Sequence, residues 1–338
     1  MVEDRFGNLI DELTDGLIKQ KIQNNEIHNT PQAIEKAIED IYADKRYQEA
    51  ICEIYKKESQ KRARLIRKLS YEKVLYERAY ENEFLARQDQ IWGEAFITSE
   101  ILYICTLESA ESYSTFVAEQ YKGTVSYLFC ALRMIHGRAM QMYLEIICLI
   151  KNGFADGAYA RWRSLYELAI ISAFIKKYGE SVAKSYLDMI GGDQDYEWAR
   201  KASCFTDNSN HSKKISFNQI RKWCGLNKEA WDQEYSLSCQ LVHASPTATA
   251  YRLGTPENAP RVIAVGRSNY GVGKAAIHAA QTLCQITSDF FSVLHHGDSI
   301  LAASTFFKWT ERIKRTYTQI VQRCIIESTE APSSDTQR

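Results

Sequence analysis

The stretch Ala160–Phe174, ARWRSLYELAIISAF, is the clearest helical segment of the chain. It forms a helix with apolar residues on nearly every side, and such a helix is normally buried. Arg163 and Glu167 nevertheless lie one helical turn apart on one face. A buried charge must be paired, because desolvating an isolated ion costs several kcal/mol. The stretch therefore predicts a core helix that carries a charged pair.

The bulk composition is that of an ordinary globular protein. The chain has 338 residues, of which 45% are hydrophobic, and its 42 basic and 42 acidic residues cancel. No overall charge attracts nucleic acid or a membrane, so such binding would need a local patch. The apolar runs fall short of the roughly 20 residues of a membrane span, which predicts no membrane partner.

The cysteines and the first residues bear on location. Nine Cys, none in Cys-x-x-Cys spacing, argue against a zinc cage or a redox motif and suit a reducing compartment. The opening MVEDRFGNLI does not resemble a signal peptide. We expect a cytoplasmic protein without metal or cofactor.

Helical periodicity runs through most of the chain, and its five Pro lie outside the long periodic stretches. This predicts an all-α fold: a helical bundle with a long N-terminal helical arm. Thr30 and Pro31 are typical of a helix start. The expected long helices span residues 44–87, 98–119, 123–151, 156–178, 271–296 and 298–327.

The predicted organisation is an arm at 1–95, a bundle domain at 96–327 and a disordered tail at 328–338. Charged residues crowd the arm and its apolar stripe is narrow, so its helix should be exposed. We expect the arm to fold back on the bundle or to contact another chain, in a homodimer or with a different protein. Residues 246–268 hold three of the five Pro and read as a long connection.

Two elements are candidate site residues, each with a structural alternative. Arg163 and Glu167 form either an ion pair that locks the bundle or a guanidinium held ready for an anionic ligand. His243 and Ser245, in CQLVHASP, form either a helix end or a histidine that moves a proton or contacts phosphate, with Ser245 as its hydrogen-bond partner.

Other charged stretches are weaker candidates for a functional site. The cluster Arg133, His136 and Arg138 and the run KKESQKRARLIRK at 56–68 read as solvated basic faces, although the run could contact phosphates. GRSNYGVGKAA lacks the spacing and the hydroxyl of a P-loop, because Ala275 follows Lys274. His295–His296 lacks the context of a metal site.

The stretches NGFADGAYARWRSLYELAIISAFI and YSLSCQLVHASP together resemble the bacterial domain-of-unknown-function family 5677 over about residues 100–300. That family has a Gly-x-x-x-x-Ala…Arg-Ser-Leu-x-Glu helix and a later His-x-Ser element. The resemblance implies a helical fold and connects the two candidate elements in one pocket. The residues that carry it are Arg163, Ser164, Leu165, Glu167, His243 and Ser245.

Such a pocket is similar in kind to those of HEPN-type helical ribonucleases, which cleave RNA with an Arg and a His and no metal. HEPN proteins place both residues on one helix, with four to six residues between them. Here the corresponding positions before His243 are Ser236, Leu237 and Ser238, so the Arg would come from another helix.

Two functions remain open. One is an RNA- or nucleotide-directed enzyme, a bacterial stress or phage-defence effector, that uses Arg163, Glu167, His243 and Ser245. The other is a non-catalytic helical module that binds a ligand or a protein, with the same residues as a structural clasp.

Overall fold

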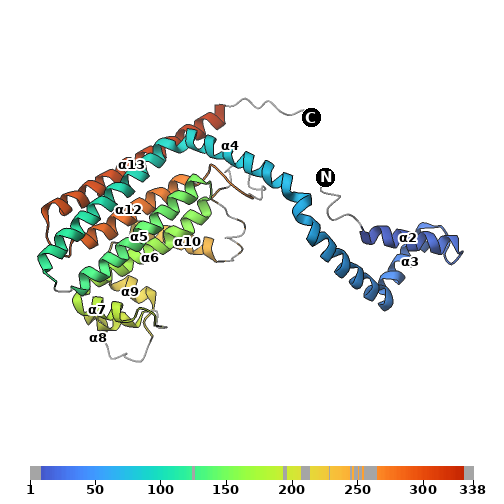
Figure 1. Cartoon of the computed structure of the whole chain (residues 1–338), viewed down its shortest axis with the longest axis horizontal. Helices are drawn as coiled ribbons and strands as arrows, with labels where there is room; N and C mark the ends of the chain where they lie inside the picture. The colour runs from blue at the N-terminus through green and yellow to red at the C-terminus, as the bar shows by residue number, and fades with distance from the viewer. Residues whose placement is uncertain are drawn as a thin grey trace. The chain divides into compact units, whose positions relative to one another are not determined.

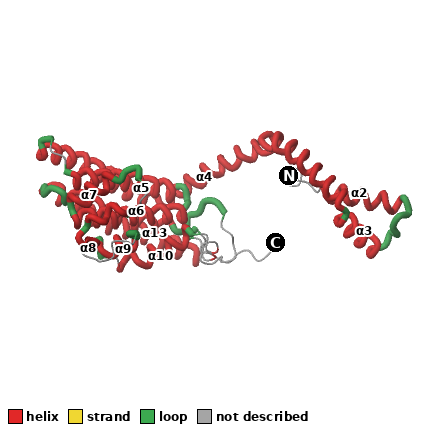
Figure 2. Tube along the Cα trace, turned by 90° about the horizontal axis from the view of Figure 1, so that it is seen from below, coloured by secondary structure: helices red, strands yellow, loops and turns green. Residues whose placement is uncertain are grey.

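The structure is a computed structural model of the chain. It describes residues 9–123, 126–192, 196–206, 214–227, 229–243, 246, 250, 253–254 and 265–330. Within these ranges 85% of residues are helical, in 12 helices, and no strand occurs. Figure 2 colours these helices red. The all-α prediction is therefore confirmed. Among the same residues, no helix is both long and apolar enough to cross a membrane.

Figure 1 labels the helices along the chain. Their bounds are α2 (Leu9–Gln23), α3 (Pro31–Ala43), α4 (Lys45–Tyr121), α5 (Tyr127–Lys151), α6 (Ala155–Tyr178), α7 (Glu180–Asp188), the 3-10 helix η1 (Glu197–Lys201), α8 (Ser203–Thr206), α9 (Phe217–Trp223), α10 (Glu229–Val242), α12 (Val272–Phe291) and α13 (Gly297–Glu330).

Helix α4 corrects one prediction. Separate helices were expected at 44–87 and 98–119, but a single helix runs through Lys45–Tyr121. Trp92, Phe96, Ser99 and Leu102 are all buried and recur at steps of three or four residues, so one helical face continues across the expected break. The stretch contains no Pro, and its one glycine, Gly93, is accommodated within the helix.

The chain divides into two compact units, Met1–Glu83 and Phe84–Arg338. The division falls inside α4, ahead of the expected boundary at 95–96. In the first unit, Ile18, Ala37 and Ile41 form a small apolar cluster between α2 and α3. Helix α3 starts at Pro31 with Thr30 as N-cap, as predicted.

The first-unit part of α4 is exposed, as its charge density predicted. Thr14 and Tyr47 join α2 to the start of α4 through hydroxyl groups 2.8 Å apart. Beyond this point large side chains remain in solvent, and Tyr55, Tyr71 and Tyr76 are 54%, 54% and 64% exposed. Whether this helix folds back on the bundle or contacts another chain stays a prediction.

The second unit is the helical bundle. Helix α12 packs against α5, α6 and α13, and these helices lie side by side in Figure 1. The part of α4 from Phe84 onward packs on α13: Trp309 Nε1 donates to the Thr98 carbonyl at 2.8 Å, and the Ser99 and Tyr317 hydroxyls are 3.1 Å apart. Helix α9 packs on α6, and α7 contacts α5 and η1.

Helix α6 is a core helix, as its sequence predicted. Trp162, Leu165, Tyr166 and Ala169 have no exposed surface. Trp162 also donates from Nε1 to Thr282 Oγ1 on α12 at 3.0 Å, which satisfies the indole inside the core. Most of the predicted connection at 246–268, and the predicted tail from residue 331 onward, lie outside the described residues; α13 itself continues to Glu330.

Candidate functional site

Arg163 and Glu167 form an ion pair on α6, with Nε and Oε1 3.1 Å apart. The pair lies at the edge of the core, since its side chains are 23% and 29% exposed. Tyr235 on α10 completes it: its hydroxyl donates to Glu167 Oε1 at 2.9 Å, and the Arg163 guanidinium lies over its ring at 5.9 Å. A neighbouring helix therefore seals the pair on one side.

The two partners stabilise the charged form of Arg163. Burial alone would lower the pKa of its guanidinium, but the adjacent Glu167 carboxylate and Tyr235 outweigh this and raise it. Desolvation and the Glu167 charge also raise the pKa of the Tyr235 hydroxyl, which therefore stays protonated as a donor. Arg163 is therefore positively charged at neutral pH.

A pocket of about 410 Å³ opens beside this pair. It has a second cation, Arg161, whose Nε donates to Glu145 on α5. Its lining joins α5, α6 and the end of α10: Leu149, Gly157, Ala160, Arg161, Arg163, Ser164, Glu167 and Val242. Two arginines held by carboxylates at an open pocket can receive an anionic group.

Of the other two predicted site residues, the structure describes only His243. His243 is exposed and directly follows the last residue of α10, where its backbone N–H donates to the Cys239 carbonyl at 3.1 Å. Its neighbour Val242 lines the pocket, whereas His243 is not one of the lining residues. Ser245 lies outside the described residues. The convergence of Arg163, Glu167 and His243 stays a prediction.

Another arginine, Arg221, extends the network around Tyr235. Arg221 on α9 donates from Nε to the Tyr166 hydroxyl at 3.2 Å and pairs with Asp232 on α10. Its guanidinium lies 4.8 Å from the Tyr235 ring centroid. Tyr235 is thus in contact with two arginines, and α10 is joined to both α6 and α9. Sequence spacing gave no sign of this, because the partners come from separate elements.

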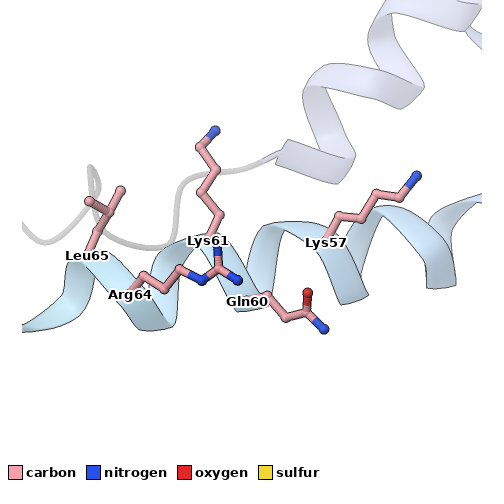
Figure 3. Close-up of a pocket in the computed structure, with 5 residues that line it drawn as sticks. All are labelled: Lys57, Gln60, Lys61, Arg64 and Leu65. Carbon is pink, nitrogen blue, oxygen red and sulfur yellow. The ribbon is translucent and has the colours of Figure 1, made fainter.

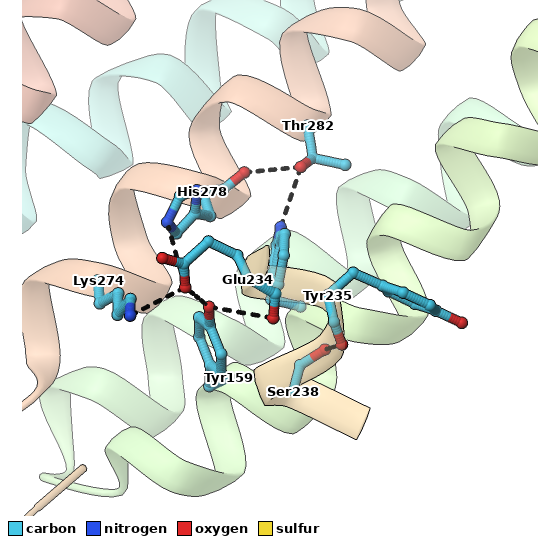
Figure 4. Close-up of polar contacts among 8 residues, drawn as sticks. Tyr159, Glu234, Tyr235, Ser238, Lys274, His278 and Thr282 are labelled. Carbon is cyan, nitrogen blue, oxygen red and sulfur yellow. Dashed lines mark hydrogen bonds and ion pairs between the residues drawn. The ribbon is translucent and has the colours of Figure 1, made fainter. Parts of the chain in front are cut away.

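A further polar cluster surrounds Glu234, the neighbour of Tyr235 (Figure 4). Its Oε2 accepts from the Tyr159 hydroxyl, lies 2.9 Å from Lys274 Nζ and lies 3.9 Å from His278 Nε2. Burial would raise the pKa of Glu234, but Tyr159 and Lys274 lower it. The carboxylate is ionised and ties α10 to α6 and α12.

This cluster was missed by the sequence analysis, although a signal existed. Lys274, His278 and Thr282 recur every four residues along α12, which places them on one face. Burial lowers the pKa of His278, which favours the neutral ring. Lys274, the residue that gave GRSNYGVGKAA its likeness to a phosphate loop, pairs with Glu234 instead.

The prediction that Arg133, His136 and Arg138 form a solvated basic face is wrong for His136. The two arginines are exposed, but His136 is only 3% exposed and its ring stacks on Phe290 at 5.1 Å. Its Nε2 lies 3.1 Å from Thr287 Oγ1, which itself donates to the Leu283 carbonyl. Thr287 can therefore only accept, so the proton of His136 is on Nε2. Burial lowers the pKa of this ring to about 4.

No group of three or more His, Cys, Asp and Glu side chains in the described ranges is arranged to hold a metal ion. All nine cysteines are free thiols. His296, half of the rejected His-His pair, has its Nδ1 2.9 Å from Ser299 Oγ at the start of α13. It contributes to the turn between α12 and α13.

Residues 129–194 match the model of DUF5677, which is described as a family of unknown function. This confirms the predicted resemblance over a segment that includes most of α5, all of α6 and α7, and the Arg163–Glu167 pair. The match ends before His243 and Ser245. No curated protein and no solved structure matches the chain.

Proposed function

We propose that this chain, whose α5–α7 segment resembles a family of unknown function, is a metal-independent enzyme that acts on RNA or a nucleotide. One observation carries the proposal: the ion-paired guanidinium of Arg163 lines an open pocket of about 410 Å³, together with Val242, the neighbour of His243. An open pocket that holds a cation, and whose lining ends next to an exposed histidine in the chain, is suited to a phosphate ligand.

Each residue has a separate role in this proposal. Arg163 stabilises the negative charge that builds on phosphorus, and Glu167 holds its guanidinium in place. His243 moves a proton at the 2′-hydroxyl or at the leaving oxygen, and Ser245 is its hydrogen-bond partner. The likeness in kind to HEPN-type ribonucleases motivates these roles. An enzyme of this kind would act in the cytoplasm as a stress or phage-defence effector.

The experiment is a cleavage assay with purified protein and labelled RNA, and with free nucleotides in parallel. The His243→Ala variant should lose the activity while its free energy of unfolding changes by no more than about 1 kcal/mol, because the side chain is exposed. His295→Ala, which removes another exposed histidine of the same unit, is the control and should stay active. A wild-type protein that alters neither RNA nor nucleotides, or an active His243→Ala variant, would contradict the proposal.

A second candidate is a non-catalytic module for a ligand or a protein, in which the same residues are a structural clasp. The observation that favours it is the contact of Tyr235 with both members of the pair. In this case the ion pair and the tyrosine serve to fasten α10 to α6, and the pocket is incidental.

Glu167→Ala tests the clasp. It removes the acceptor of Tyr235 and leaves Arg163 without its partner. We expect a loss of about 1–3 kcal/mol in the free energy of unfolding, less than the roughly 3–5 kcal/mol of a fully buried pair, because both side chains are partly exposed. Chemical denaturation measures it, with Glu119→Ala on the exposed side of α4 as the control. An unchanged stability would show that the pair fastens nothing.

The two candidates differ in the pattern of effects. If the chain is an enzyme, His243→Ala affects only activity and Glu167→Ala affects both activity and stability. If the residues form only a clasp, Glu167→Ala destabilises the fold, His243→Ala leaves it nearly unchanged because the side chain is exposed, and there is no activity to lose.

A further inference from the structure

The most basic segment of the chain lies on the exposed part of α4. Residues 56–68 contain seven basic side chains and a single acidic one, Glu58. The chain as a whole is neutral, so this segment is a strong local departure from its average. Glu58 is engaged within the helix, 3.3 Å from Lys61 and 3.9 Å from Arg62. The remaining positive charge faces solvent.

These cations share one helical face. Lys57, Lys61, Arg64 and Lys68 follow one another at steps of four, three and four residues, which aligns them along about 16 Å of helix. All four are exposed. A hollow of about 280 Å³ lies along this stripe, lined by Lys57, Gln60, Lys61, Arg64 and Leu65 (Figure 3).

The stripe continues into an aromatic side chain. Tyr71 follows Lys68 three residues later, on the same face, and is 54% exposed. We call Lys57, Lys61, Arg64, Lys68 and Tyr71 the basic stripe. A row of cations that ends in an exposed ring combines the two contacts of single-stranded nucleic-acid binding, namely phosphate neutralisation and base stacking.

We propose that the basic stripe binds single-stranded RNA. RNA is named because this inference rests on the proposed function; the geometry itself points to a single-stranded polyanion that carries bases. The stripe would bind the strand through its backbone, without reading its sequence. It belongs to the first compact unit and the pocket to the second, so binding and cleavage can be tested separately.

Two other occupants fit the charges less well. A membrane-surface helix needs a continuous row of large apolar residues opposite its cations. Tyr55 and Ile66 lie on that face, but the row is interrupted by Ser59, Ala63, Ser70 and Glu77. A second copy of the same stripe would bring like charges together, which is unfavourable. A negatively charged polymer is the partner that the stripe complements.

The test is fluorescence anisotropy with a labelled 2′-O-methyl oligouridine, which cannot be cut at a 2′-hydroxyl. A length of about 20 nucleotides exceeds the roughly 4–16 nucleotides of one typical single-strand site. The full-length chain is compared with a variant that carries Lys57→Gln, Arg64→Gln and Lys68→Gln. The control carries Lys19→Gln, Lys36→Gln and Lys308→Gln, which removes the same charge from exposed positions elsewhere.

The expected loss follows from counterion release. Each phosphate contact to a single strand adds about 0.7 to the slope of log K against log salt, which is roughly fivefold in affinity at about 0.1 M salt. Three lost contacts should weaken binding about 100-fold and lower the slope by about 2. The control variant should bind as the wild type does. Tyr71→Ala should weaken binding without changing the slope, because stacking involves no counterion.

Three results would overturn the inference: equal losses in the stripe and control variants, binding to anionic vesicles that the oligonucleotide does not displace, or a dimer that dissociates when the stripe is neutralised. Failure of the proposed function has a different result. Stripe-dependent binding without cleavage of ordinary RNA would remove the enzyme and keep the binding surface. Cleavage of RNA by the wild type, together with normal binding by the stripe variants, would keep the enzyme and remove the binding surface.

Discussion

Replacing Gly153 by alanine is expected to lower the free energy of unfolding by about 2–5 kcal/mol, because left-handed strain and overpacking add. Gly153 connects α5 to α6 and has a φ of 76°. A Cβ at this position would lie 2.6 Å from the Phe84 ring and 2.8 Å from the backbone nitrogen of Ser268. The second contact cannot relax by a rotamer change, and Ser268 N–H also donates to the Gly153 carbonyl at 3.0 Å.

Urea denaturation followed by circular dichroism measures this effect. Gly137→Ala is the matched control: it lies within α5, and a Cβ there meets nothing within 4 Å. Alanine should stabilise that helix by up to about 1 kcal/mol. Equal stabilities for the two variants would show that the α5–α6 turn is not built as described.

Acid should destabilise the bundle through His136. The pKa of this buried ring is about 4 in the folded chain, against an ordinary value of 6.5. Below pH 6.5 the His136 ring therefore binds a proton in the unfolded chain, whereas in the folded chain it stays neutral until the pH approaches 4. The free energy of unfolding is therefore undiminished by this group above pH 6.5 and falls as the pH drops toward 4. The loss is about 2 kcal/mol at pH 5 and about 3 kcal/mol in total.

Unfolding free energies at pH 7 and pH 5 isolate this effect in the variant His136→Gln. Glutamine keeps an N–H for Thr287 but does not titrate, so the variant should lose about 2 kcal/mol less than the wild type between the two pH values. The burial-depressed pKa of His278 has the same sign but is present in both proteins, and it cancels in the comparison. Identical pH dependence of the two proteins would place His136 outside the core.

The fold could be predicted from the sequence because helical periodicity is a local signal. The start of α3 at Pro31 and the ion pair on α6 both follow from short-range spacing. The expected break in α4 was wrong because the change in charge density was read as an interruption. Trp92 and Ser99 show that the helix only changes from an exposed face to a buried one.

The surroundings of the site could not be predicted in this way. Tyr235, Arg221 and Asp232 meet only when α9 and α10 pack on α6, and no spacing along the chain encodes that packing. His136 was readable, because Leu132, Ile135 and Ala139 place it within a buried stripe. Arg133 before it and Arg138 after it made the stretch look like a basic face instead.

The proposed site of Arg163, Glu167 and His243 is tested by the distance between the Arg163 guanidinium and the His243 imidazole in a crystal structure. We expect about 6 Å or less, because a direct hydrogen bond spans about 3 Å and one bridging water roughly doubles that reach. A separation of more than about 10 Å would contradict a shared site, since neither contact could then form.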